Sequence, residues 1–154
     1  MDSMLQRQLT ICERRAASGD IHEMEMMIAH LRATHGGNPA LDEHLSSLSR
    51  GAYGQRLQEN LKALRGHIEH EGFTIRMLAQ GVRECSIKLG MNEPDDLQEL
   101  ERHGYRVAAE RYVLQARRED SRQIRIRLRS FARHFAMLAG PFCELEIEAA
   151  LAAA

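Results

Sequence analysis

The sequence is poor in the residues that build β-sheets and in those that interrupt helices. It contains no tryptophan, only 5% aromatic residues and three prolines among 154 residues. Alanine, leucine, arginine, glutamate and methionine are abundant instead, and these residues favour helices. Too few β-branched and aromatic residues remain to supply the faces of a sheet. The composition therefore predicts an all-α protein.

Long apolar runs and paired cysteines are missing as well. No stretch of about eighteen apolar residues occurs, as a membrane-spanning helix requires, and the first residues lack the apolar core of a signal peptide. Cys12, Cys85 and Cys143 are odd in number and far apart, with no Cys-x-x-Cys pair. We therefore expect a cytoplasmic protein that forms no disulfide and does not associate with membranes.

The short motifs of common catalytic sites are also lacking. The sequence has no Gly-x-x-x-x-Gly-Lys-Ser/Thr phosphate loop, no Gly-x-Ser-x-Gly turn and no Glu-x-x-His pair. The nearest approach to a metal site is His67, His70 and Glu71, whose spacing matches no zinc-peptidase motif; histidines at a helix C-terminus are favoured by the dipole alone. We predict no metal, no cofactor and no enzymatic activity, and leave a metal-dependent helical enzyme as the third choice.

The composition otherwise fits a folded domain. Hydrophobic residues make up 44% of the chain and charged residues 28%, close to the average for globular proteins. The length suits one helical domain over 1–154, with 1–50 and 51–140 as candidate sub-units and a terminal helix over 141–154.

Apolar residues at helical spacing divide the first part of the chain into five expected helices. The first ends near Ala16. The second begins after Asp20, which has the spacing of a capping box with Glu23, and it ends before the glycines and proline of 36–39. A short third helix is expected over 41–48.

The fourth and fifth expected helices form an antiparallel hairpin. The fourth covers 52–71, with Ile68 on its apolar face and Gly72 as its C-terminal cap. The fifth covers 73–89 and is stopped by 90–94. The single glycine between them leaves room only for a tight turn.

The stretch between Pro94 and Pro141 is too long for one straight helix in a compact domain, because it would run about 68 Å. A polar segment over 117–123 separates two apolar stripes, and Asp120 and Gln123 have capping-box spacing. We favour a break or bend near Asp120; the alternative is a continuous helix that pairs with another copy of itself. The fold expected is six to seven helices in antiparallel hairpins with a long C-terminal helical segment.

Charge is arranged in blocks along the second half of the chain. Residues 93–101 carry five carboxylates and no base, whereas 102–133 carry ten arginines against three carboxylates. On a helix, four of these arginines share one side, opposite an apolar side, which is typical of a surface that binds an acidic protein or nucleic acid. Alternatively, these arginines pair with the chain's own carboxylates over 93–101 and 144–148, and we favour this explanation. The four arginines are Arg118, Arg122, Arg125 and Arg129.

Three methionines lie close together on the second expected helix. Met24, Met26 and Met27 spread over about 300° of the helix, so at least one of them must face away from the core. Methionine adapts its shape and is common at surfaces that repack against partners. Met26 and Met27 are therefore candidate binding residues, although simple core filling explains the pattern equally well.

A partial helix-turn-helix pattern supports a second hypothesis. Residues 86–92, followed by Leu97 and Leu100, resemble the middle of this DNA-binding motif. The recognition helix would begin with carboxylates at 93–96, which repel phosphate. We therefore expect a non-enzymatic protein–protein interaction protein, an adaptor, chaperone-like or inhibitory protein that also self-associates as a homodimer. The alternative is a nucleic-acid-binding regulator that uses the arginines.

Overall fold

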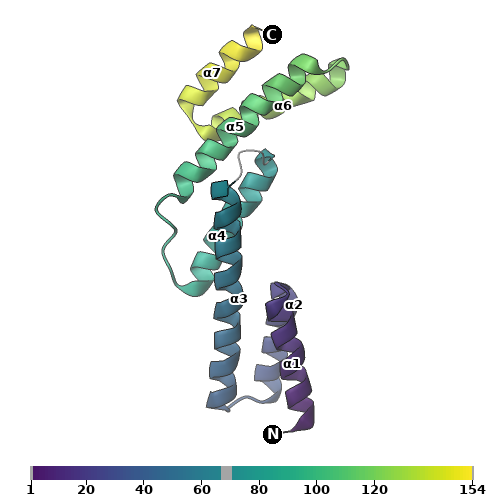
Figure 1. Ribbon diagram of the computed structural model, residues 1–154, viewed down its shortest axis with the longest axis vertical. Helices are drawn as coiled ribbons and strands as arrows, with labels where there is room; N and C mark the ends of the chain where they lie inside the picture. The colour runs from purple at the N-terminus through teal and green to yellow at the C-terminus, as the bar shows by residue number, and fades with distance from the viewer. Residues whose placement is uncertain (1, 67–70, 154) are drawn as a thin grey trace. The chain divides into compact units, whose positions relative to one another are not determined.

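The computed structural model describes residues 2–66 and 71–153 and confirms the all-α prediction. Within these ranges the chain forms seven helices and no strand (Figure 1). No helix of the described ranges combines the length and the hydropathy needed to cross a bilayer. The helices are α1 (Ser3–Ala17), α2 (Ile21–Thr34), α3 (Pro39–Gly66), α4 (Gly72–Leu89), α5 (Leu97–Arg118), α6 (Arg122–Ala139) and α7 (Pro141–Ala152).

The helices are distributed over two compact units. Unit 1 consists of Met1–Glu59 and Val82–Asn92, and unit 2 consists of Asn60–Gly81 and Glu93–Ala154. Helices α1 and α2 belong to unit 1 and helices α5, α6 and α7 to unit 2, while α3 and α4 each contribute a segment to both. Each unit has its own set of buried apolar side chains.

In unit 1, α1 and α2 pack as a hairpin whose turn is fixed by backbone hydrogen bonds. Gly19 has a φ of 76°. Its N–H donates to the Ala16 carbonyl at 3.2 Å, and the Asp20 N–H donates to the Arg15 carbonyl at 3.0 Å, which together form a Schellman motif. The Asp20 side chain then accepts a hydrogen bond from the Glu23 N–H at 3.3 Å. The predicted cap of the second helix is confirmed.

The prediction of separate helices over 41–48 and 52–71 is wrong. Helix α3 is continuous from Pro39 to Gly66 and passes through Gly51 and Gly54. Each interior glycine costs roughly 1 kcal/mol relative to alanine. Leu45 and Leu57, on either side of the glycines, are buried, and burial of a leucine contributes roughly 1.5–3 kcal/mol. Burial of apolar side chains on both sides of the glycines therefore outweighs their cost.

Gly72 was expected to end a helix, and this prediction is also wrong, because Gly72 is the first residue of α4. The described part of α3 ends at Gly66, and Ile68, predicted for its apolar face, lies outside the described residues. Gly72 is buried, and a methyl group at this position would collide with the ring of Phe135. Packing, rather than a helix cap, explains the glycine.

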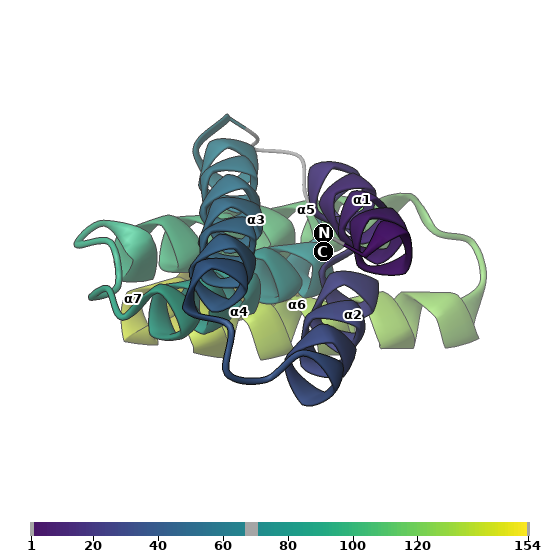
Figure 2. The same ribbon diagram turned by 90° about the horizontal axis from the view of Figure 1, so that it is seen from below.

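In unit 2, α5 and α6 lie antiparallel and α7 packs on both (Figures 1 and 2). The break predicted near Asp120 is confirmed, because α5 ends at Arg118 and α6 begins at Arg122. The continuous-helix alternative is excluded. The capping residue is Ser121 rather than Asp120, since the Ser121 hydroxyl accepts from the Ile124 N–H at 3.5 Å.

Phe135 of α6 is the centre of the unit 2 core. Its side chain is completely buried. The rings of Tyr105 and Tyr112, both on α5, stack near it at centroid distances of 5.7 and 5.8 Å, and Phe73 of α4 meets it edge-on at 5.0 Å. Aromatic pairs of these geometries contribute about 0.5–1.5 kcal/mol each beyond the area they bury. The cluster fixes α6 against α4 and α5.

The close approach at Gly72 predicts opposite effects for two glycine substitutions. Gly72→Ala should lower the free energy of unfolding by about 1–3 kcal/mol, because the methyl group overpacks the core against Phe135. Gly51→Ala, at an open helical position with no neighbour within 4 Å, should raise it by up to about 1 kcal/mol. Urea titration followed by circular dichroism measures both. Equal stability of the two variants would contradict the packing assignment.

All three cysteines are free and buried. Burial raises the pKa of each thiol above its ordinary value of 9.0. A raised pKa means that the unfolded chain loses these protons at lower pH than the folded chain does. The stabilisation that the neutral thiols contribute is therefore complete below pH 9.0 and is lost as the pH rises through the raised values.

This burial predicts slow thiol chemistry and alkaline destabilisation. In the native protein at mildly alkaline pH, the three thiols should react with Ellman's reagent far more slowly than in urea. The urea midpoint should fall as the pH is raised above 9.0. A variant with Cys12, Cys85 and Cys143 all replaced by alanine should show a smaller fall. Rapid reaction of any thiol in the native protein would show that its site opens readily.

Candidate functional site

A hollow rich in arginine lies where α5, α6 and α7 meet in unit 2. Its volume is about 470 Å³. Four arginines surround an apolar floor; α5 supplies one of them, and the first two turns of α6 supply the other three. We call this hollow the arginine groove. Its lining residues are Val113, Ala116, Arg117, Arg122, Arg125, Ile126, Arg129 and Leu151.

Two of the arginines hold the end of α7. Arg117 donates from Nη2 to the carbonyl of Ala150 at 3.0 Å, and Arg129 donates from Nη2 to the carbonyl of Leu151 at 3.4 Å. The last carbonyls of a helix lack partners within the helix and carry the negative end of its dipole. Arg117 and Arg129 therefore neutralise this end of α7 and form one wall of the groove.

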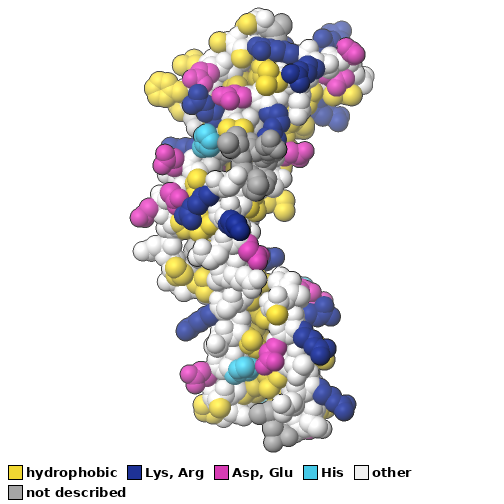
Figure 3. All heavy atoms as spheres, viewed as in Figure 1, with side chains coloured by type: hydrophobic (Ala, Val, Ile, Leu, Met, Phe, Trp, Pro, Cys, Tyr) yellow, Lys and Arg dark blue, Asp and Glu magenta, His cyan; other side chains and the backbone are white. Residues whose placement is uncertain are grey.

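The other two arginines of the groove are not matched by carboxylates. Within residues 2–66 and 71–153, no carboxylate lies within 4 Å of the guanidinium of Arg122 or Arg125. The same holds in this part of the chain for Arg118 and Arg127, which are also exposed. Positive charge is thus concentrated where α5 ends and α6 begins. Dark blue side chains mark this concentration at the upper end of the face shown in Figure 3.

Several of the chain's own carboxylates are paired with other cations. Glu148 of α7 forms an ion pair with Arg133 at an N–O distance of 2.7 Å, and Glu146 forms one with Arg106 at 3.1 Å. In the acidic stretch over 93–101, Asp96 binds Arg65 at 3.1 Å, and hydrogen bonds from this guanidinium lower the pKa of the Asp96 carboxyl. Internal pairing, favoured from the sequence, therefore accounts for Arg133 and not for Arg122 or Arg125.

The floor of the groove is apolar and largely closed to water. Val113, Ala116 and Leu151 are buried, whereas Ile126 is exposed at the rim. Guanidinium groups bind carboxylates or phosphates through paired hydrogen bonds. A groove with both features can bind an anionic group and an apolar side chain at once.

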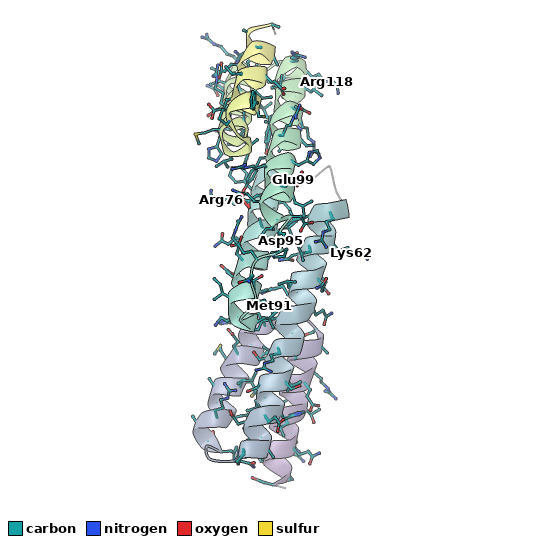
Figure 4. The ribbon with its side chains drawn as sticks, turned by 90° about the vertical axis from the view of Figure 1, so that its left-hand side faces the viewer. Lys62, Arg76, Met91, Asp95, Glu99 and Arg118 are labelled. Carbon is teal, nitrogen blue, oxygen red and sulfur yellow. The ribbon has the colours of Figure 1, made fainter. Side chains whose placement is uncertain are left out.

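The structure brings three of the four predicted arginines together. Arg122, Arg125 and Arg129 line the groove, but Arg118 does not, because it lies on the last turn of α5 and points away from the helix (Figure 4). The break at 119–121 puts Arg118 on a different helix from the other three. Arg117 was not predicted as a site residue, and its only signal in the sequence was its position one turn after Val113.

Met26 and Met27 lie in unit 1, on α2. Met24 is completely buried, Met26 is 57% exposed and Met27 is half-buried. The prediction that at least one methionine faces away from the core is confirmed.

The structure gives no support to the two other candidate sites from the sequence, the histidine cluster and the partial helix-turn-helix. Among the described residues, no group of three histidine, cysteine or carboxylate side chains could hold a metal ion, and His67 and His70 lie outside those residues. At the partial helix-turn-helix, α4 ends at Leu89 in a Schellman motif around Gly90, and α5 begins only at Leu97. The turn of a helix-turn-helix has three or four residues, fewer than this connection.

Comparisons with protein-family models, with curated proteins and with solved structures find no match to this chain. The chemistry of the arginine groove is therefore the basis for a functional proposal.

Because Arg122 and Arg125 are not paired with carboxylates of the described residues, we expect that replacing them does not destabilise the protein. Arg122→Gln with Arg125→Gln should leave the free energy of unfolding unchanged or slightly higher, because the change removes repulsion between like charges and breaks no ion pair between described residues. Any gain should shrink at high salt, which screens the repulsion. Arg133→Gln is the matched control and should slightly lower stability through loss of the Glu148 pair. Urea titration at low and high salt measures these effects; clear destabilisation by the double change would assign the two arginines a structural role.

Proposed function

We propose that this chain is a non-enzymatic interaction protein that binds an acidic, partly apolar segment of another protein in the arginine groove. The observation that carries the proposal is the pair Arg122 and Arg125, exposed beside an apolar floor without a carboxylate within 4 Å in the described part of the chain. Unbalanced positive charge on a folded surface repels itself. A partner that supplies carboxylates removes this repulsion on binding.

The apolar component favours a protein segment over a phosphate chain. Arginine and apolar side chains together are typical of the centre of protein–protein interfaces. Nineteen of the twenty-one basic residues are arginine, which binds carboxylates bidentately and is less strongly hydrated than lysine. An adaptor or inhibitory protein in the cytoplasm fits this surface and the free, buried thiols.

A nucleic-acid-binding regulator is the second candidate. The observation in its favour is the cluster of exposed arginines around the break between α5 and α6, including Arg118 and Arg127. Glu119 and Asp120 lie in the same break and repel phosphate. Binding through phosphates alone would leave the apolar floor of the groove without a role.

A labelled amphipathic peptide with glutamates on one face and leucines on the other tests the proposal. We expect it to bind the full chain, and expect Arg122→Glu with Arg125→Glu to weaken binding at least about tenfold, equivalent to ~1.4 kcal/mol. Replacing the peptide's glutamates by glutamines, or its leucines by serines, should weaken binding in the same way. Fluorescence anisotropy at physiological salt measures all four affinities.

The control variant carries the same change of charge away from the groove. Arg7→Glu with Arg14→Glu alters two exposed arginines of α1 and should leave peptide affinity within about twofold. Equal weakening by both charge reversals would contradict a specific groove. Tighter binding of a DNA duplex than of the peptide, with affinity falling steeply with salt and lost in the groove variant, would favour the nucleic-acid alternative.

A further inference from the structure

Helix α7 is apolar on two opposite faces. The inner face packs on α5 and α6 through Cys143, Ile147 and Leu151, all buried. The opposite face carries Phe142, Leu145, Ala149 and Ala152, spaced three, four and three residues apart, and all of them are exposed. Phe142 is 85% exposed and Leu145 is 71% exposed. Hydrophobic side chains lie at the surface over this helix in Figure 3.

This outer stripe is unusual for a helix on the surface of a folded unit. A surface helix normally presents polar residues to water, whereas a helix that is apolar all round is normally buried. Isolated exposed apolar residues are common, but four in helical register form a continuous stripe. The stripe therefore has the character of an interface.

The two carboxylates that flank the middle of the stripe are already neutralised. Glu146 and Glu148, on either flank, are paired with Arg106 and Arg133 of the same chain. Two unpaired acidic helices would repel each other. These intrachain pairs permit two copies of α7 to approach.

We propose that the outer face of α7 binds the same face of a second copy of this chain, with the two helices antiparallel. Large side chains occupy the first half of the stripe and small ones the second half. A two-fold axis through the middle of the stripe sets Phe142 opposite Ala152 and Leu145 opposite Ala149, and the residue numbers in the two pairs have the same sum, as such an axis requires. The stripe is therefore complementary to itself in size.

The same register sets Glu144 level with Ala150 of the other copy, near the end of α7 that Arg117 and Arg129 cap. Glu144 is exposed and has no ion pair within residues 2–66 and 71–153. Arg122 and Arg125 lie closer to the start of α6 than Arg129, so the second copy leaves them accessible.

The size of the stripe sets the strength of the association. Helix α7 has 12 residues and is about 18 Å long. One such helix face buries less than the roughly 800 Å² per partner of a standard stable interface. The dimer should therefore be weak, with a population that rises with protein concentration.

Sedimentation velocity of the full chain over a wide concentration range tests the proposal. The weight-average mass should rise from 17.5 kDa toward twice that value. Leu145→Gln with Phe142→Gln should keep the chain monomeric at every concentration, and unchanged circular dichroism would show that it still folds. Met77→Gln, the same kind of change at an exposed position of α4, is the matched control and should dimerise normally. A native chain that stays monomeric throughout, or association that survives the double change, would overturn the proposal.

Cysteine cross-linking tests the antiparallel register. The three native thiols are buried and can remain. Mixing Leu145→Cys chains with Ala149→Cys chains under mild oxidation should give mainly the mixed disulfide dimer, because the proposed register sets these positions opposite each other. Predominant Leu145→Cys homodimers would overturn it in favour of a parallel pair. The proposal is independent of peptide binding: Arg122→Glu with Arg125→Glu should weaken that binding and leave dimerisation intact.

Discussion

Complete burial of Phe135 is the constraint on which unit 2 depends. Its ring is surrounded by side chains from α4 and α5, and Gly72 leaves the space that the ring fills. Phe135 lies on α6 and can reach the core only if α6 packs along α5. The chain therefore folds back at 119–121, directly after α5 ends. The arginines at the start of α6 are thereby held beside the end of α5, and the groove forms between them.

Ion pairs are unevenly distributed among the arginines of unit 2. Carboxylates of α7 are used to attach the helix to α5 and α6 through Arg106 and Arg133. The arginines nearer the break receive none of these carboxylates, and two of them bind backbone carbonyls instead. Exposed ion pairs contribute little to stability. Their larger effect here is on the distribution of charge, because no ion pair within residues 2–66 and 71–153 neutralises Arg122 or Arg125.

Much of the architecture follows from local sequence signals. Helical spacing and the Asp20 cap predicted the first two helices, and the polar segment before Ile124 predicted the break between α5 and α6. The continuity of α3 could not be predicted in this way, because local signals place a break at 49–51, which includes Gly51, and give no weight to the buried leucines on either side. The groove was predicted only in part. Arg117 joins it because α7 returns to the end of α5, and that contact joins residues 33 positions apart in the sequence.

The turn between α1 and α2 has a consequence for how this chain tolerates change in length. Asp20 donates its backbone N–H to the end of α1 and caps the start of α2 with its side chain. Every residue of the turn therefore has a fixed place in the hydrogen-bond pattern. Inserting or deleting a single residue there would rotate α2 by about 100° about its axis relative to α1. Met24, Ile28 and Leu31 would leave the interior together, and polar residues would take their places. Length variation at this turn is therefore incompatible with the present core of unit 1.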